Sequence, residues 1–334
     1  MKKLLPWALL LLLTLLLTAS ACAEVTLRLS EVQAADYPTG LADQEFARLV
    51  EEKTQGRVKV DCHFSGTLYD KEAAAVEALQ DGEIAFARVS AAPVGSFVPE
   101  INALILPYLY KSSAHMWAVL KGEIGLKVLN DIEASGRGII GLCWYDGGSR
   151  CFYSTAPLYQ ASDLAGKKFS MPDNPLMLDM VKTLGAQGVS GIGANEVFSA
   201  LQTGAIDGAE NNIPTYQNMG DYEAAPYYLL DHHTRMPEVL LASASVPKLV
   251  SPEDWAIIRQ CAVEVQDFQI EEYRKKEEAS YQILRDAGVE LIEMTPLSLV
   301  EIQYMMKPIY LKYAFDYIDL VSEIQSIGEA YENE

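Results

Sequence analysis

The chain has 334 residues, of which 50% are hydrophobic and 22% are charged, so it contains enough apolar material for one or two domains with a sizeable core. Its formal net charge of -20 at pH 7 excludes nucleic acid and anionic membrane surfaces as partners bound through bulk electrostatics.

Residues 1–23 have the pattern of a secretory signal peptide. Two lysines precede a leucine-rich run over residues 4–18, and Ala21-Cys22-Ala23 offers a cleavage site before Glu24. The run is shorter than the ~20 residues that a spanning helix needs, so we predict export with cleavage rather than a membrane anchor. Cys22 leaves a lipid anchor open as an alternative.

In the first half of the mature chain, the predicted elements alternate between strand and helix. Alternating apolar residues indicate strands, and apolar residues at helical spacing indicate helices that end at glycine. In chain order we predict a strand at 25–30, a helix from 38 to about 53, a strand at 57–62, a helix ending before Gly82, a strand around Arg88, helices at 113–120 and 123–134, and a strand at 138–145.

The second half continues the same alternation after a turn at Asp146-Gly147-Gly148. We predict strands at 151–154, 168–171, 227–230, 239–243 and 289–293, helices at 176–184 and 196–203, one long helix over 252–286, and a last helical region from residue 295. Ser251 followed by Pro252 is a strong start for the long helix, because serine caps the free N–H groups and proline fits the first turn. A rod of that length, about 50 Å, can brace two lobes.

One helix–glycine–strand unit occurs twice. Residues 76–90 align without a gap with residues 198–212, with Gly82 matching Gly204 and Arg88 falling opposite Glu210. Asp70 and Asn195, both good N-cap residues, precede the two helices, and we expect them to cap these helices. Two copies predict two similar α/β lobes, and such sheets bind ligands beyond the carboxyl ends of their strands. The alternative is that the shared pattern is only a common joint between a helix and a strand.

Two arginines occupy positions that favour a role in binding. Arg88 lies inside an apolar strand, where an unpaired arginine is rare, so it needs a partner that is either a ligand or a structural carboxylate. Arg150 follows the Gly-Gly turn and can present its planar fork to a carboxylate, although a solvated turn arginine is the alternative.

The cysteines and histidines do not suggest a metal site. Four scattered cysteines remain in the mature chain, and we predict buried free thiols, with a disulfide between Cys143 and Cys151 left open. His232 and His233 are adjacent, a spacing that is poor for joint metal binding. We therefore expect no metal, and no motif calls for a cofactor.

Taken together, the motifs make the sequence similar to the extracytoplasmic solute-binding subunits of TRAP (tripartite ATP-independent periplasmic) transporters, the DctP-type family. The resemblance covers nearly the whole mature chain. It rests on the segments 46–56, 96–100, 106–108, 195–212 and 251–254. It implies a two-lobed periplasmic binding protein fold of the α/β class, with crossing strands and a long C-terminal bracing helix.

The same resemblance implies a division into lobes. Residues 24–147 with about 237–275 are expected to form the first lobe, and residues 148–236 with about 276–334 the second. The mature protein is expected to be a periplasmic monomer that closes on a small organic acid and delivers it to the small and large membrane subunits of the transporter.

The ligand-contact positions of the family can be carried over residue by residue. The arginine that usually grips the ligand carboxylate is replaced here by Ser170, whereas the second family arginine matches Arg150 and the family asparagine matches Asn211. The full expected set is Arg150, Asn211, Arg88, Ser170, Asp173, Glu31, Tyr37 and Glu210. These variants look most like members assigned to sugar acids such as hexuronates, or to C4-dicarboxylates.

Two other functions stay open at this point. Because Ser170 removes one positive charge, the ligand could be a nonacidic polar solute. An exported hydrolase using the cluster over residues 231–235 is the rival from another class, and we predict no enzyme activity because no Gly-x-Ser-x-Gly elbow or His-Glu-x-x-His helix occurs.

Overall fold

The computed structural model describes residues 24–331. The predicted signal peptide, including Cys22, lies outside the described residues, as do residues 332–334.

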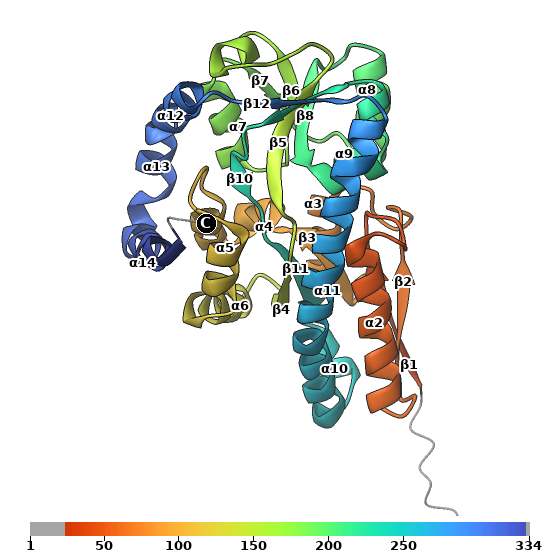
Figure 1. Cartoon of the computed structure of the whole chain (residues 1–334). Coiled ribbons are helices and arrows are strands. Elements are labelled where there is room, and N and C mark those ends of the chain that lie inside the picture. The colour runs from red at the N-terminus through yellow and green to blue at the C-terminus, as the bar shows by residue number, and fades with distance from the viewer. Residues whose placement is uncertain (1–23, 332–334) are drawn as a thin grey trace, which may run out of the picture.

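Two mixed sheets, one in each lobe, form the framework of the protein (Figure 1). The first has the strand order β2-β1-β3-β11-β4, and the second has the order β12-β9-β5-β8-β6-β7, with β10 paired to β5. The strands of the first sheet are β1 Val25–Ser30, β2 Val58–His63, β3 Phe86–Ser90, β4 Ile139–Tyr145 and β11 Glu238–Ser243. Those of the second are β5 Ser149–Ser154, β6 Lys168–Ser170, β7 Gln187–Val189, β8 Gly208–Asn212, β9 Tyr227–Leu230, β10 Thr234–Arg235 and β12 Glu290–Glu293.

Helices cover the sheets and confirm most of the predicted elements. Helices of the first lobe are α2 Pro38–Lys53, α3 Glu72–Asp81, α4 Ala91–Phe97, α5 Ser113–Leu120 and α6 Glu123–Ala134. The others are α7 Pro175–Thr183, α8 Val197–Gln202, α9 Ile213–Asn218, α10 Val246–Leu249, α11 Pro252–Asp286, α12 Pro296–Met305, α13 Lys307–Tyr313 and α14 Ile318–Gly328. Short 3-10 turns fill several of the remaining connections, among them η1 Pro99–Ile105.

The two repeated units occupy equivalent places in their sheets. Strand β3 lies between a parallel neighbour, β1, and an antiparallel one, β11, and β8 likewise lies between parallel β6 and antiparallel β5. Gly82 and Gly204 both have positive φ, 74° and 70°, which a side chain would resist at a helix end. The prediction of two similar lobes is therefore confirmed, with Arg88 and Glu210 at matching positions.

Each of the predicted helix caps of these units is wrong by one residue. We expected Asp70 and Asn195 to cap the two helices, but α3 begins after Lys71 and α8 after Glu196, neither of which makes a side-chain capping bond. Both expected caps lie instead where the lobes meet. The Asn195 amide donates across the gap to the Ser65 carbonyl at 3.3 Å.

Helix α11 braces both lobes, as predicted. Ser251 caps it by accepting from the Asp254 N–H, and the helix runs for 35 residues alongside α2 and β4 of the first lobe and α9 of the second (Figure 1). Within the described residues, we find no helix with the length and apolar character that crossing a membrane requires.

The crossover between the sheets is clamped against α11. The buried side chain of Gln269 accepts from the Asp146 N–H at 2.6 Å and donates to the Asp146 carbonyl at 3.0 Å. Gly148 has a φ of 61°, and a Cβ there would lie 2.1 Å from the Tyr273 hydroxyl, so only glycine fits. The turn between β4 and β5 is thus held to the helix that spans both lobes.

The proposed lobe boundaries stay a prediction. Strands β1 to β4 and β11 share one sheet, and the remaining strands share the other. The last helix, α14, contacts α5 of the first lobe, where His115 Nε2 lies 2.8 Å from the Ile324 carbonyl, although we had placed it in the second.

Candidate functional site

A cavity of about 350 Å³ lies between the two lobes. It is reached by residues of α3 and β3 from the first lobe and of β5, β6 and β8 from the second. Six of the eight predicted ligand residues line it, namely Arg88, Arg150, Ser170, Asp173, Glu210 and Asn211. The repeated strands therefore bring the residues that the sequence singled out to one shared cavity.

Arg150 is held in place by two neighbours from β8, the strand paired with its own. Its Nε and one terminal nitrogen donate to the Glu210 carboxylate at 2.5 and 2.9 Å, and that same terminal nitrogen also donates to the Glu210 carbonyl at 2.7 Å. The other terminal nitrogen, NH1, donates to Asn211 Oδ1 at 2.9 Å. Among the described residues, the second hydrogen of NH1 and the amide hydrogens of Asn211 have no partner, so they are available to a guest.

A histidine and an aspartate support the Arg150 partner from behind. His233 Nε2 lies 3.2 Å from the Glu210 carboxylate, and His233 Nδ1 lies 2.9 Å from Asp231. The carboxylate of Asp231 raises the pKa of His233 to about 9 against the opposing effect of burial, so the ring is charged and donates from both nitrogens. The Arg150 and His233 charges lower the pKa of Glu210 to about 2, although burial opposes this. Four buried groups of alternating charge thus fix the direction of Arg150.

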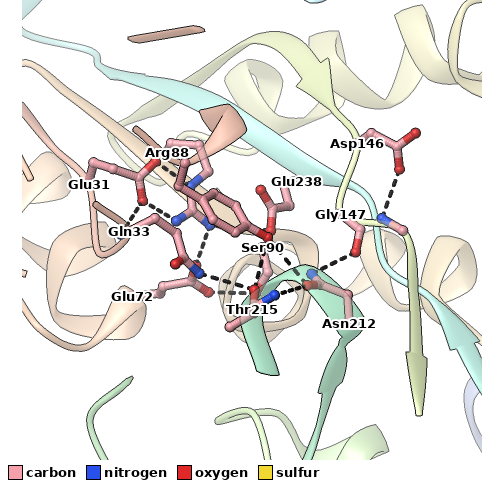
Figure 2. Close-up of polar contacts among 12 residues, drawn as sticks. Glu31, Gln33, Glu72, Arg88, Ser90, Asp146, Gly147, Asn212, Thr215 and Glu238 are labelled. Atoms are coloured by element: carbon pink, nitrogen blue, oxygen red, sulfur yellow. Dashed lines mark hydrogen bonds and ion pairs between the residues drawn. The ribbon is translucent and has the colours of Figure 1, made fainter. Parts of the chain in front are cut away.

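Arg88 is surrounded by three carboxylates (Figure 2). It forms a two-pronged pair with Glu31, donates from NH1 to Glu72 at 2.8 Å, and lies 3.4 Å from Glu238. Its side chain is only 1% exposed. Of the two partners that the sequence left open for Arg88, a ligand or a structural carboxylate, the structure therefore favours structural carboxylates.

Two predicted ligand residues do not line the cavity. Glu31 is fully buried, and its oxygens are occupied by Arg88 and by the Gln33 N–H at 2.8 Å. Tyr37 is 1% exposed, and its hydroxyl lies 3.3 Å from Asn212 Oδ1 and 3.0 Å from Thr215 Oγ1. Both residues sit behind the cavity, since one orients an arginine and the other joins the first lobe to the second.

Several residues that line the cavity were not selected from the sequence. Five of them are acidic, namely Asp70, Glu72, Glu77, Asp221 and Glu238, and one is basic, Lys71. Burial raises the pKa of Glu238 to about 8 and that of Asp221 to about 6, so Glu238 is mainly neutral at pH 7. The position of Glu72 at the start of the repeated helix α3 was the one signal in the sequence that pointed to these acidic residues. The cavity offers many acceptors and few cations.

The lobes touch around this cavity. The buried Asn174 amide, from the second lobe, donates to the Ala92 carbonyl at 2.7 Å, and the Gln33 amide donates to Thr215 Oγ1 at 3.3 Å. The structure therefore describes a conformation in which the lobes are closed over the cavity.

The buried charges make stability depend on pH in a predictable direction. Glu210 has a lowered pKa, so its contribution is complete above about pH 4.5 and is lost toward pH 2. His233 has a raised pKa, so its contribution is complete below about pH 6.5 and is lost toward pH 9. Glu238 binds a proton more readily when folded, so ionising it between pH 4.5 and 8 also lowers stability.

We therefore expect the free energy of unfolding to fall between pH 6.5 and pH 9, measured by urea unfolding at a series of pH values. The Glu238→Gln variant has a neutral side chain at position 238 at every pH. Its free energy of unfolding should therefore fall less over this range than that of the wild type. Parallel curves for the two proteins would contradict the raised pKa of Glu238.

The cysteines are free, as predicted. Cys143, Cys151 and Cys261 are buried thiols and Cys62 is partly buried. Among residues 24–331, no cluster of histidine, cysteine and acidic residues has the arrangement of a metal site.

Comparison with known proteins gives a consistent result. The family model described as bacterial extracellular solute-binding protein, family 7 (DctP) matches residues 29–316. A solute-binding protein of Chromohalobacter salexigens is 34% identical over 88% of this chain and 86% of its own length.

Solved structures agree in fold. A TRAP periplasmic solute-binding protein from Pseudomonas putida F1 with bound D-glucuronate superposes with a TM-score of 0.87 at 32% identity, over 90% of this chain and 97% of that one. One from Xanthobacter autotrophicus Py2 with bound β-D-galacturonate has a TM-score of 0.86 at 33% identity, over 90% and 99%.

Such proteins bind substrates for transporters and are not enzymes, which removes the hydrolase from consideration. The family match covers most of the chain, the strand order forms two lobes, and a polar cavity lies between them. The chain belongs to family 7 of the bacterial extracellular solute-binding proteins, the DctP family of TRAP solute-binding proteins.

Proposed function

We propose that this protein captures a monocarboxylic sugar acid, such as a hexuronate, between its lobes and delivers it to a TRAP transporter. The observation that carries the proposal is the buried Arg150, fixed by Glu210 and still offering one N–H to the cavity. The bound D-glucuronate and β-D-galacturonate of the similar structures support the ligand class.

The carboxylate of the ligand is placed at Arg150 NH1 and the Asn211 amide. A charge-assisted bond of this kind is about twice as strong as a neutral one, and it provides the orientation. Ser170 lines the cavity at the position where the family resemblance places the usual carboxylate-binding arginine, and it supplies a neutral hydrogen bond instead. A cavity of about 350 Å³ is within the range of small-ligand sites.

The hydroxyl groups of the sugar are placed against the acidic wall. Asp173, Glu72 and Glu77 line the cavity and accept hydrogen bonds, which suits a guest with many O–H donors. The same wall disfavours a second ligand carboxylate, because like charges at close range repel. We therefore favour monocarboxylic sugar acids over C4-dicarboxylates.

Calorimetry on the mature protein tests this order. D-Glucuronate, D-galacturonate and D-galactonate are expected to bind, with succinate and L-malate at least about tenfold weaker because their second carboxylate faces the acidic wall. D-Glucose is the matched neutral sugar. If D-glucose bound as tightly as D-glucuronate, the ligand would be a nonacidic polar solute and not a sugar acid. If succinate bound more tightly than D-glucuronate, the protein would prefer C4-dicarboxylates over sugar acids.

Delivery requires partners that lie outside this chain. We propose that the exported monomer is periplasmic, freed by cleavage before Glu24 or lipid-anchored through Cys22, and that its closed form docks on the small and large membrane subunits. Closure would be a two-state hinge motion, favoured by a ligand that contacts both lobes.

A further inference from the structure

A second cavity, of about 730 Å³, shares no lining residue with the first. Its walls come from three places: the loop over residues 107–111 of the first lobe, the segment 230–235 that joins the sheets, and the C-terminal helices α12 and α13 with the start of α14. Figure 1 shows α13 standing apart from the sheets, on the side away from α11. The volume lies within the range of small-molecule sites.

The charge of this second cavity is opposite to that of the protein. Lys111, Arg235 and Lys307 line it, with Asp231 as its one acidic residue, in a chain whose net charge is -20. The Asp231 carboxylate is already bonded to His233 at 2.9 Å and to the Phe152 N–H at 3.1 Å. The cavity wall therefore supplies no free countercharge to these cations, and the acidic groups that interact electrostatically with Arg235, Asp146 and Glu277, lie outside the wall.

Polar groups of the wall lack partners. Arg235 is half-buried, and its guanidinium makes no ion pair or hydrogen bond with any described residue. The hydroxyl oxygens of Tyr108 and Tyr110 are buried without a hydrogen-bond partner in the described part of the chain, and Tyr110 as a whole is only 7% exposed. Buried polar groups are normally satisfied, so each of these requires an explanation.

The rest of the wall is apolar. Leu230, Leu299, Leu311 and Ile318 line the cavity together with the ring of Tyr310. Leu311 and Ile318 are 76% and 57% exposed, and because they line the same cavity they belong to one exposed apolar patch. A guest that covers them needs an apolar body as well as a negative charge.

We propose that this cavity binds an amphipathic organic anion, that is, a carboxylate or sulfonate carried on an aliphatic or aromatic body. The anionic head pairs with Arg235 and the neighbouring lysines, and it accepts hydrogen bonds from the tyrosine hydroxyls. The body lies along the leucines of α12 and α13. Size, charge and unsatisfied donors all agree with one occupant of this chemistry.

The second cavity is linked to the sugar-acid cavity. Asp231 lines the second cavity, Glu210 and Arg150 line the first, and His233 joins them through contacts of 2.9 and 3.2 Å. Its wall also contains parts of the first lobe and of the segment between the sheets. A ligand that fits the second cavity in the closed form of the protein stabilises that closed form. By linkage, it then strengthens the binding of the sugar acid.

The first test uses the fluorescent anion 1-anilinonaphthalene-8-sulfonate with the full mature chain. The dye is expected to bind at one site, decanoate is expected to displace it, and decyltrimethylammonium, which has the same chain length and the opposite charge, is not. Equal displacement by the cation would overturn the proposal, since an apolar patch alone would then explain binding.

Variants locate the site. Leu311 and Phe315 are both 76% exposed, but only Leu311 lines the cavity, so Leu311→Glu is expected to weaken dye and decanoate binding about tenfold and Phe315→Glu to leave both unchanged. Arg235→Gln is expected to weaken binding by a similar factor, with exposed Arg137→Gln as its control. If the two variants of either pair bound dye and decanoate equally well, with thermal unfolding unchanged, the ligand would not bind in this cavity.

Coupling is measured separately by calorimetry with D-glucuronate. Saturating decanoate is expected to raise the affinity for D-glucuronate in the wild type, but not in Leu311→Glu. An unchanged affinity would remove the link between the cavities, while dye binding tests the second site even if D-glucuronate is not the ligand of the first.

Discussion

Replacing Arg150 by glutamine is expected to lower the affinity for the best-bound sugar acid by at least about a hundredfold, measured by calorimetry. Removing one partner of a desolvated charge pair commonly costs 2–5 kcal/mol, because the other charge is left uncompensated. Here the ligand carboxylate loses its donor, and the charge of Glu210, no longer compensated by Arg150, repels that carboxylate.

The control for this variant is Arg137→Gln, an exposed arginine on the first lobe whose removal should leave the affinity unchanged. The His233→Gln variant tests whether His233 helps to hold Glu210 in place. It retains a hydrogen-bond donor near Glu210 but loses the positive charge, so its affinity for the sugar acid should fall less than that of Arg150→Gln. Full affinity in a folded Arg150→Gln protein would show that the ligand is held elsewhere.

Replacing Arg88 by methionine is expected to destabilise the fold by about 3–5 kcal/mol, the usual cost of breaking a buried ion pair by removing one partner. The carboxylates of Glu31 and Glu72 and the carboxyl group of Glu238 would remain around an apolar side chain. The free energy of urea unfolding at pH 7 measures the effect.

Arg48→Met is the matched control, because Arg48 also contacts two glutamates but is 56% exposed. Exposed pairs contribute about 0–1 kcal/mol, so that variant should unfold close to the wild type. Equal destabilisation of the two variants would contradict the structural role of Arg88. Acidification offers a second check, since protonating the carboxylates should reduce the difference between Arg88→Met and the wild type.

Local patterns were sufficient to predict most of the framework. The serine–proline start and the glycine after residue 286 delimit α11 because capping and helix stops depend on neighbours within one turn. The repeat of helix, glycine and strand placed Arg88 and Glu210 at matching positions because the glycine fixes the register of the strand that follows it. The cavity residues of β8 then followed from the end of that strand.

Partners distant in sequence could not be predicted in the same way. Glu31 lies 57 residues from Arg88, and the two meet only because β1 and β3 are adjacent in the sheet. Tyr37 was expected at the ligand only because the segment over residues 37–43 resembles that of family members assigned to sugar acids. Its hydroxyl instead reaches Thr215, 178 residues away, in a contact between the two lobes.

The clamp on the crossover limits how the lobes can move. Gly148 packs closely against Tyr273, and the Gln269 side chain bonds to both the N–H and the carbonyl of Asp146. Strands β4 and β5 therefore cannot twist at this turn without moving the middle of α11. Opening of the lobes should therefore bend helix α11 and not only change the conformation of the connecting turn. A bent helix resists further bending, so the ligand-free protein should favour one angle between the lobes.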